Sequence, residues 1–218
     1  MGRYDINPRT KLPVKDEESD LPIDAYHGRL HSFILSLIPI LKVIFRVKKP
    51  IGIENIPKSG GLVIAGNHSR WTNPIVVQSV VTDRKLFYLG KSSLLKWPVI
   101  GSVVMSLGSI PVDRSVHNSG ARSYASQQLK KGGALLIFPE GTSNRDKKML
   151  PFKFGAVSIA YKANVPIVPM AIWKGKTMFA SPIKAGKDLE KTNEQLRQII
   201  DKMRSELMRK KIVLKHTN

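Results

Sequence analysis

A histidine and an asparagine five residues apart, His68 and Asn73, stand in the stretch NHSRWTNP, directly after the apolar run GLVIAG. A neutral imidazole at the end of a buried strand can take a proton from an alcohol, and strand ends in α/β sheets commonly face a ligand crevice. A histidine with a purely structural role gives the same pattern. Asn73 followed by Pro74 is also typical of a helix start. The pair predicts either a catalytic base with an orienting partner or an ordinary strand-to-helix loop.

Two more segments end apolar runs with groups that can bind anions. In FPEGTSNRD, which begins at residue 138, Glu140 and Gly141 follow the strand-like run. A glycine lets the backbone approach a ligand closely, and exposed N–H groups in such a turn can bind an oxyanion or a phosphate. An ordinary turn is the alternative. In GSIPVDR (108–114), Arg114 carries a planar fork that suits phosphate, and a salt bridge to Asp113 is the structural alternative.

The elements that would position these residues follow from the hydropathy pattern. Short apolar runs bounded by Gly, Pro or charged residues predict buried strands at 61–67, 86–90, 108–112, 134–139 and 165–173. Helical patterns predict helices at 74–81, 98–107, 119–131, 152–163 and 188–211, and a last short strand is expected at 212–216. Because strands alternate with helices, we expect an α/β fold, a single-domain sandwich with a mixed, largely parallel sheet.

The chain is strongly basic: 36 of its 218 residues are Lys or Arg and 16 are Asp or Glu, for a net charge of +20. Between residues 25 and 187 the only acids are Glu54, Asp83, Asp113, Glu140 and Asp146. The basic body predicts a polyanionic partner, and charge alone does not choose between anionic lipid and nucleic acid. The absence of cysteine excludes thiol nucleophiles, disulfides and Cys-based metal sites, and it fits a reducing cytosol.

The N-terminal part predicts a polar arm followed by a membrane-associating segment. Residues 1–26 are polar and acidic, lack the apolar region of a secretory signal, and are expected to form a flexible arm. Within 27–49, the apolar stretch 33–45 is too short to span a bilayer, which takes about 20 residues. Its apolar bulk and basic flanks predict an amphipathic helical segment that lies in the membrane interface, and a buried core helix is the alternative. The remaining residues, 50–218, would form the catalytic domain.

Taken together, these motifs resemble those of a known enzyme family. His68 with a polar residue five positions later, GSIPVDR, FPEGT and VPIVP (165–169) occur in this order. They resemble the four-block signature of the glycerophospholipid acyltransferases, specifically the PlsC-type 1-acyl-sn-glycerol-3-phosphate (lysophosphatidate) acyltransferases, over about residues 50–175. The resemblance implies transfer of a fatty acyl group from acyl-CoA or acyl-carrier protein to the sn-2 hydroxyl of lysophosphatidate, giving phosphatidate. It also implies no bound cofactor or metal, and a peripheral or monotopic enzyme on the cytoplasmic face of the cell membrane.

The resemblance also implies a role for each site residue. His68 would be the general base, and Asn73 stands where the family has the aspartate that orients it. The remaining residues would bind or shape the site of the glycerol phosphate: Lys91, Arg114, Glu140, Gly141, Thr142 and Arg145. Pro166 to Pro169 would form scaffold near the acyl-chain cleft.

Two departures from the family pattern affect the predicted chemistry. An asparagine carbonyl can still accept from the Nδ1–H of a neutral imidazole, but it offers no negative charge to the imidazolium, and the wrong amide orientation favours the wrong tautomer. Asn73 is therefore a working native variant, an introduced Asp→Asn change that slows turnover, or a sign of lost or altered activity. In the third block Ser143 stands where the family usually has arginine, and Arg145 could partly substitute as a cation.

Two other functions are alternatives to acyl transfer to lysophosphatidate. The first is acyl transfer to another lysophospholipid or to an amine-bearing lipid, although Arg114 favours an acceptor that carries a phosphate. The second is nucleic-acid binding, which the low aromatic content of 7%, the scattered basic residues and the lack of a reading motif disfavour. No metal site is expected, because the histidines at 27, 31, 68, 117 and 216 show no ligand spacing with nearby acids.

Overall fold

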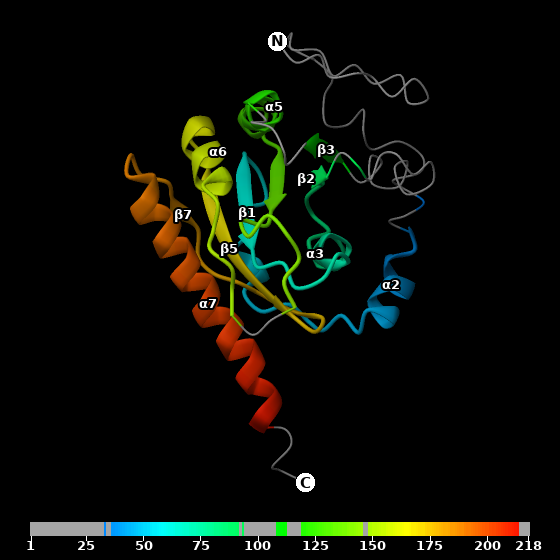
Figure 1. Ribbon diagram of the computed structural model, residues 1–218. Coiled ribbons are helices and arrows are strands. Elements are labelled where there is room, and N and C mark those ends of the chain that lie inside the picture. The colour runs from blue at the N-terminus through cyan, green and yellow to red at the C-terminus, as the bar shows by residue number, and fades with distance from the viewer. Residues whose placement is uncertain are drawn as a thin grey trace.

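The centre of the fold is a mixed seven-stranded sheet with the strand order β3-β2-β4-β1-β5-β6 and with β7 beside β5 (Figure 1). Neighbours from β3 to β5 run parallel, whereas β6 and β7 run antiparallel to β5. The strands are β1 (Leu62–Gly66), β2 (Leu86–Lys91), β3 (Ser109–Val112), β4 (Ala134–Ile137), β5 (Pro166–Trp173), β6 (Lys176–Phe179) and β7 (Ile183–Lys184).

This computed structural model describes residues 33, 36–91, 93, 108–112, 119–145 and 148–213. The predicted arm at 1–26, the predicted helix at 98–107 and Arg114 lie outside the described residues. The same holds for most of the first half of the predicted 27–49 segment.

Helices cover both faces of the sheet, because the strands are apolar on both sides. Val63 and Ala65 of β1 belong to one hydrophobic core, and Leu62 and Ile64 belong to the other. The helices are α2 (Ile38–Ile44), α3 (Asn73–Val80), α5 (Ser119–Lys130), α6 (Gly155–Ala163) and α7 (Leu189–Val213), with a short 3-10 turn η2 (Ile53–Asn55). Residues of α5, α6 and α7 pack in the first core, whereas those of α3 pack in the second (Figure 1).

The sheet itself confirms the α/β prediction. Each of the five predicted strands is present, and β1 and β4 are buried at every residue, as the continuous apolar runs of parallel strands require. The hairpin of β5 and β6 was not predicted. Its turn consists of Lys174 (φ 47°) and Gly175 (φ 79°), two consecutive left-handed residues of the kind that two-residue hairpins need.

Two predicted element boundaries were wrong. The helix expected from residue 152 begins at Gly155, because the segment before it makes tertiary hydrogen bonds, among them Lys153 N–H to the carbonyl of Pro139 (2.9 Å). The strand expected at 212–216 does not begin at 212, because α7 continues through Val213. Residues 214–216 lie outside the described part of the chain.

The amino edge of the sheet is held by a buried arginine. The Arg84 guanidinium donates to the carbonyls of Pro57 (2.7 Å), Gly60 (2.7 Å) and Gly132 (2.8 Å), in loops that precede β1 and β4. Burial lowers the pKa of Arg84, but the three carbonyls satisfy its donors. Arg84 therefore has a structural role, at the edge of the sheet opposite to the carboxyl ends of the strands.

Candidate active site

The two loops that carry the central motifs leave the sheet side by side. β1 and β4 are parallel neighbours, with Ala65 opposite Ile137, so their carboxyl ends meet at one edge. β1 leads into α3 on one face of the sheet, whereas β4 leads into α6 on the other face. Neighbouring strands whose connections go to opposite faces form a switch point, where open α/β sheets bind their ligands.

A buried carboxylate joins these two loops. Glu140 is 5% exposed, and its Oε1 accepts a hydrogen bond from the backbone N–H of His68 (2.9 Å). Its Oε2 accepts from the backbone N–H of Leu150 (3.1 Å) and from Nδ2 of Asn144 (3.1 Å). Both oxygens are thus used to hold backbone and loop, which makes Glu140 a positioning residue for His68. A direct contact of Glu140 with substrate remains a prediction.

The His68 ring is held from one side by an aromatic contact. It stacks on Phe138, with 4.2 Å between ring centroids and an interplanar angle of 20°. The carbonyl of His68 accepts a hydrogen bond from the backbone N–H of Asn144 (2.6 Å), so the loops are joined on both sides of the residue. The ring is partly exposed while its Nδ1 atom is buried. The backbone of His68 is thus bonded to the neighbouring loop, and its ring packs against Phe138 at the sheet edge.

The amide of Asn73 is used by the loop that contains His68. The side chain is 3% exposed, at the first residue of α3. In the orientation that satisfies both of its polar atoms, Oδ1 accepts from the N–H of Ser69 (3.0 Å) and Nδ2 donates to the carbonyl of Arg70 (3.1 Å). An aspartate could make the first bond but not the second. In this orientation Asn73 bonds within the turn between His68 and α3.

The other predicted site residues are spread along the same edge. Lys91 is the last residue of β2 and is exposed, and Thr142 and Arg145 are exposed in the loop after β4. Gly141 closes the turn of this loop with φ 73° and donates its N–H to the carbonyl of Phe138 (3.0 Å). Arg114 lies outside the described residues, beyond the end of β3.

Sequence reasoning missed two residues that hold this site. In the sequence Phe138 is only the start of a motif, and its stacking on His68 depends on the register of β1 and β4. Asn144 is not among the predicted site residues. Its N–H donates to the carbonyl of His68, and its Nδ2 donates to Glu140 and to the carbonyl of Lys148 (2.7 Å). The only signal for it was an asparagine next to Ser143, where the family pattern breaks.

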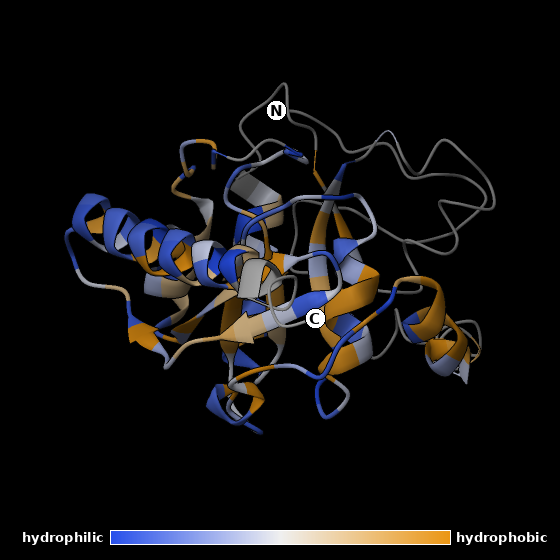
Figure 2. Ribbon diagram, turned by 90° about the horizontal axis from the view of Figure 1, so that it is seen from below, coloured by the Kyte–Doolittle hydropathy of each residue, from blue (hydrophilic) through white to orange (hydrophobic). Residues whose placement is uncertain are grey.

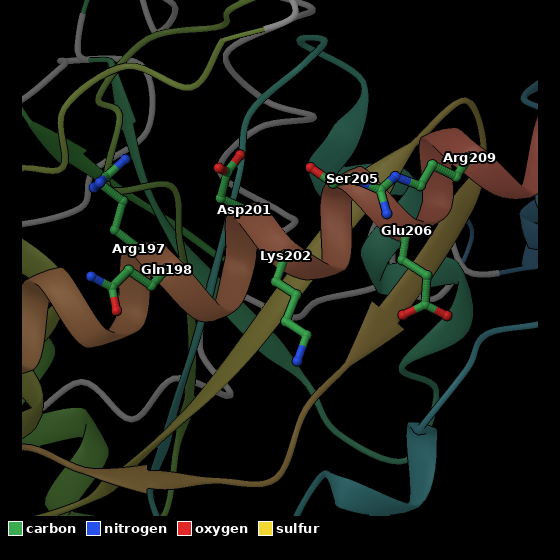
Figure 3. Close-up of a pocket in the computed structure, with 7 residues that line it drawn as sticks. All are labelled: Arg197, Gln198, Asp201, Lys202, Ser205, Glu206 and Arg209. Carbon is green, nitrogen blue, oxygen red and sulfur yellow. The ribbon is translucent and has the colours of Figure 1, made fainter.

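A hollow elsewhere on the surface has a different character. Its lining comes from α7 alone, and Arg197 and Asp201 point to one side of the helix while Lys202 and Glu206 point to the other (Figure 3). The Arg197 side chain is bonded to Glu194 within the helix (2.9 Å), which raises the pKa of the guanidinium. Because these side chains point to different sides of the helix, the hollow offers no convergent group for a ligand.

The fold and these bonded loops define an α/β protein with a candidate catalytic histidine at a switch point of its sheet. The Acyltransferase family model matches residues 49–173, a range that contains both loops. The chain belongs to the acyltransferase family.

Individual relatives carry a more specific name. The chain is 33% identical over 150 residues to the 1-acyl-sn-glycerol-3-phosphate acyltransferase of Bacillus subtilis, covering 67% of this chain and 74% of that protein. It is 32% identical over 163 residues to the chloroplastic 1-acyl-sn-glycerol-3-phosphate acyltransferase BAT2 of Brassica napus, covering 72% of this chain and 47% of that protein. It is 33% identical over 135 residues to the corresponding enzyme of Borreliella burgdorferi, covering 61% and 53%. The match thus spans about half the length of the latter two relatives.

A solved structure shares the fold. The crystal structure of the 1-acyl-sn-glycerophosphate acyltransferase PlsC from Thermotoga maritima matches with a TM-score of 0.68 at 24% identity, covering 85% of this chain and 82% of that one. The likeness extends the α/β architecture beyond the range of the family model.

Proposed function

We propose that the protein transfers a fatty acyl group from a thioester to the sn-2 hydroxyl of 1-acyl-sn-glycerol-3-phosphate, with His68 as the general base. The observation that carries the proposal is the pair of loops at the switch point, in which Glu140 bonds to the backbone of His68 within the matched family range. The names of the relatives support lysophosphatidate as the acceptor. Acyl-CoA and acyl-carrier protein are both candidate donors, and the reaction needs no bound cofactor.

The reaction removes the proton of the acceptor hydroxyl and replaces the C–S bond of the thioester by a C–O bond. The buried Nδ1 of His68 leaves Nε2 to take the proton from the acceptor hydroxyl. The hydroxyl oxygen then forms a bond to the thioester carbonyl carbon, and the tetrahedral intermediate collapses as the C–S bond breaks. The imidazolium returns its proton to the departing thiolate. The stacking of Phe138 on the ring supports this role, because it restricts the orientations that the imidazole can take.

The phosphate of the acceptor would lie beside the cations and N–H groups of the same edge. Lys91 ends β2, a direct neighbour of β4 in the sheet, and Arg145 lies in the loop that follows β4. The left-handed Gly141 allows the backbone of that loop to approach a ligand. We assign the phosphate to Lys91, Arg114 and Arg145, and the glycerol to the turn formed by Glu140, Gly141 and Thr142.

The test is acyl transfer to lysophosphatidate with both donors, followed by mass spectrometry, for the chain with Asn73 beside Asn73→Asp. We expect the natural chain to make phosphatidate and Asn73→Asp to be no faster. A carboxylate at this position loses the bond to the Arg70 carbonyl and places two oxygens about 3.1 Å apart in a buried turn, which costs about 1–3 kcal/mol of unfolding free energy. If this chain and Asn73→Asp are both silent with both donors, the proposed function is overturned. A silent chain that Asn73→Asp activates by several orders of magnitude would show that asparagine is inactivating on an otherwise intact acyltransferase.

We also propose that the helix before the sheet attaches the protein to an anionic membrane surface. None of the residues of α2 is buried, and Ile40, Val43 and Ile44 are 57%, 78% and 63% exposed. Figure 2 shows this helix as a mainly hydrophobic element at the side of the molecule. Lys42 and Arg46 lie within and just after it, so apolar and cationic groups are combined as an interfacial helix requires. In the described part of the chain, no helix is both long and apolar enough to cross a bilayer.

Replacing Val43 and Ile44 of α2 by aspartate should weaken binding to anionic vesicles by about 100- to 10,000-fold, as expected for two exposed side chains that each gain about 1.5–3 kcal/mol on burial. Stability should not change, because both side chains are exposed. The measurement is co-sedimentation with vesicles that contain phosphatidylglycerol. Tyr161→Asp is the matched control, since Tyr161 is 44% exposed on α6, across the sheet. Equal binding by the double variant and the control would contradict docking through α2.

A further inference from the structure

The side chain of Lys153 packs against the turn at Gly141, in the motif FPEGT. A Cβ atom at Gly141 would be 3.0 Å from Cε and 3.1 Å from Nζ of Lys153. The side chain of Lys153 therefore covers Gly141, with its ammonium next to the backbone of the turn. Any side chain at residue 141 would have to displace the lysine. Lys153 belongs to none of the sequence motifs, and it reaches the turn from the segment just before α6.

The backbone that carries this lysine is held in place from two sides. The N–H of Lys153 donates to the carbonyl of Pro139 (2.9 Å), in the same turn as Glu140. The carbonyl of Phe152 accepts from Nδ2 of Asn193 (3.1 Å), a residue of α7 that is 8% exposed. A long side chain on a fixed backbone loses less conformational freedom on binding than one on a mobile loop.

The ammonium is also connected to the catalytic loop through short contacts. It lies against Gly141, whose neighbour Glu140 bonds to the N–H of His68 (2.9 Å) and to the N–H of Leu150 (3.1 Å). The side chain of Lys153 is exposed, so an incoming anion can reach it. At the same turn, residue 143 is a serine and offers no charge.

From this placement we propose that Lys153 is a substrate-binding cation of the site, which holds the phosphate of the acceptor against the turn at Gly141. The inference rests on the proposed function. A lysine ammonium donates charge-assisted hydrogen bonds to phosphate oxygens, and such bonds are about twice as strong as neutral ones. Gly141 has no side chain to separate the ammonium from a ligand that lies on the turn. Lys153 thereby supplies a positive charge where Ser143 supplies none.

The test compares Lys153→Met, which keeps the aliphatic length and removes the charge, with Lys153→Arg, which keeps the charge. We expect Lys153→Met to raise KM for lysophosphatidate by about 10- to 100-fold, since a bond to a charged group is lost, and to leave KM for the acyl donor unchanged. Lys153→Arg should stay within a few-fold of the natural chain. Lys162→Met is the matched control, because Lys162 is an exposed lysine near the other end of α6.

A second arm restores the charge from the other side of the turn. Ser143→Arg in the Lys153→Met background should lower KM for lysophosphatidate again, because it returns a cation to the same turn. An unchanged acceptor KM in Lys153→Met, or a rise confined to the acyl donor, would overturn the proposal. If neither this chain nor Asn73→Asp transfers acyl groups, the proposed function fails. Lys153 is then tested by thermal unfolding with glycerol 3-phosphate, which should stabilise the natural chain and not Lys153→Met.

Discussion

Replacing His68 by alanine lowers the rate of acyl transfer by about 100- to 10,000-fold, the range that a positioned general base contributes. The backbone N–H that Glu140 holds is still present in the variant, so the loop keeps its anchor. The stacking on Phe138 is lost, which costs about 0.5–1.5 kcal/mol of unfolding free energy. The measurement is kcat at saturating lysophosphatidate and donor, together with the thermal unfolding midpoint.

Added imidazole provides the control that separates chemistry from structure. Free imidazole can enter the space left by the ring and accept the proton, so the rate of His68→Ala should rise with its concentration. The natural chain should not respond in the same way. A variant that retains a rate within tenfold of the natural chain would show that the proton goes to another group.

The strands around the site could be predicted from sequence because parallel strands are buried on both faces. Their apolar runs are continuous, and β1, β4 and β5 were recognised from hydropathy and from bounding glycines and prolines. The hairpin that ends in β6 was missed, although Lys174-Gly175 is a short-range signal for a tight turn. The start of α6 was predicted wrongly, because tertiary hydrogen bonds of residues 152–154 set where this helix begins.

The site could be predicted only as far as residue types and their order allow. The resemblance brought His68 and Glu140 into one site, and the parallel pairing of β1 with β4 explains why they meet. The atoms that bond could not be predicted, because the contact between His68 and Glu140 joins residues 72 apart in the sequence. The place of Asn73 depends on its amide orientation, and the contact of Lys153 with Gly141 depends on where α6 begins. Neither the amide orientation of Asn73 nor the start of α6 can be read from the neighbouring residues in the sequence.

Replacing Glu140 by glutamine should damage the site almost as severely as removing the catalytic base. The single oxygen of the new amide can still accept from the N–H of Leu150 and from Nδ2 of Asn144, but its NH₂ group then faces the N–H of His68, and the opposite orientation loses the other two bonds instead. At least one hydrogen bond to a carboxylate is lost, at about 1.5–3 kcal/mol, so we expect the unfolding free energy to fall by about that amount. Glu140→Ala loses all three bonds and should fall further.

The kinetic consequence follows from displacement of His68. A shift of about 1 Å in a reacting group can cost about 100-fold in rate, so kcat of Glu140→Gln should fall by that factor even at temperatures where the variant is folded. KM for lysophosphatidate should change much less, because Glu140 uses both oxygens on protein donors. Glu54→Gln, an exposed carboxylate on η2, is the matched control and should behave as the natural chain. If Glu140→Gln instead raises the acceptor KM at an unchanged kcat and stability, the carboxylate binds substrate directly and does not position His68.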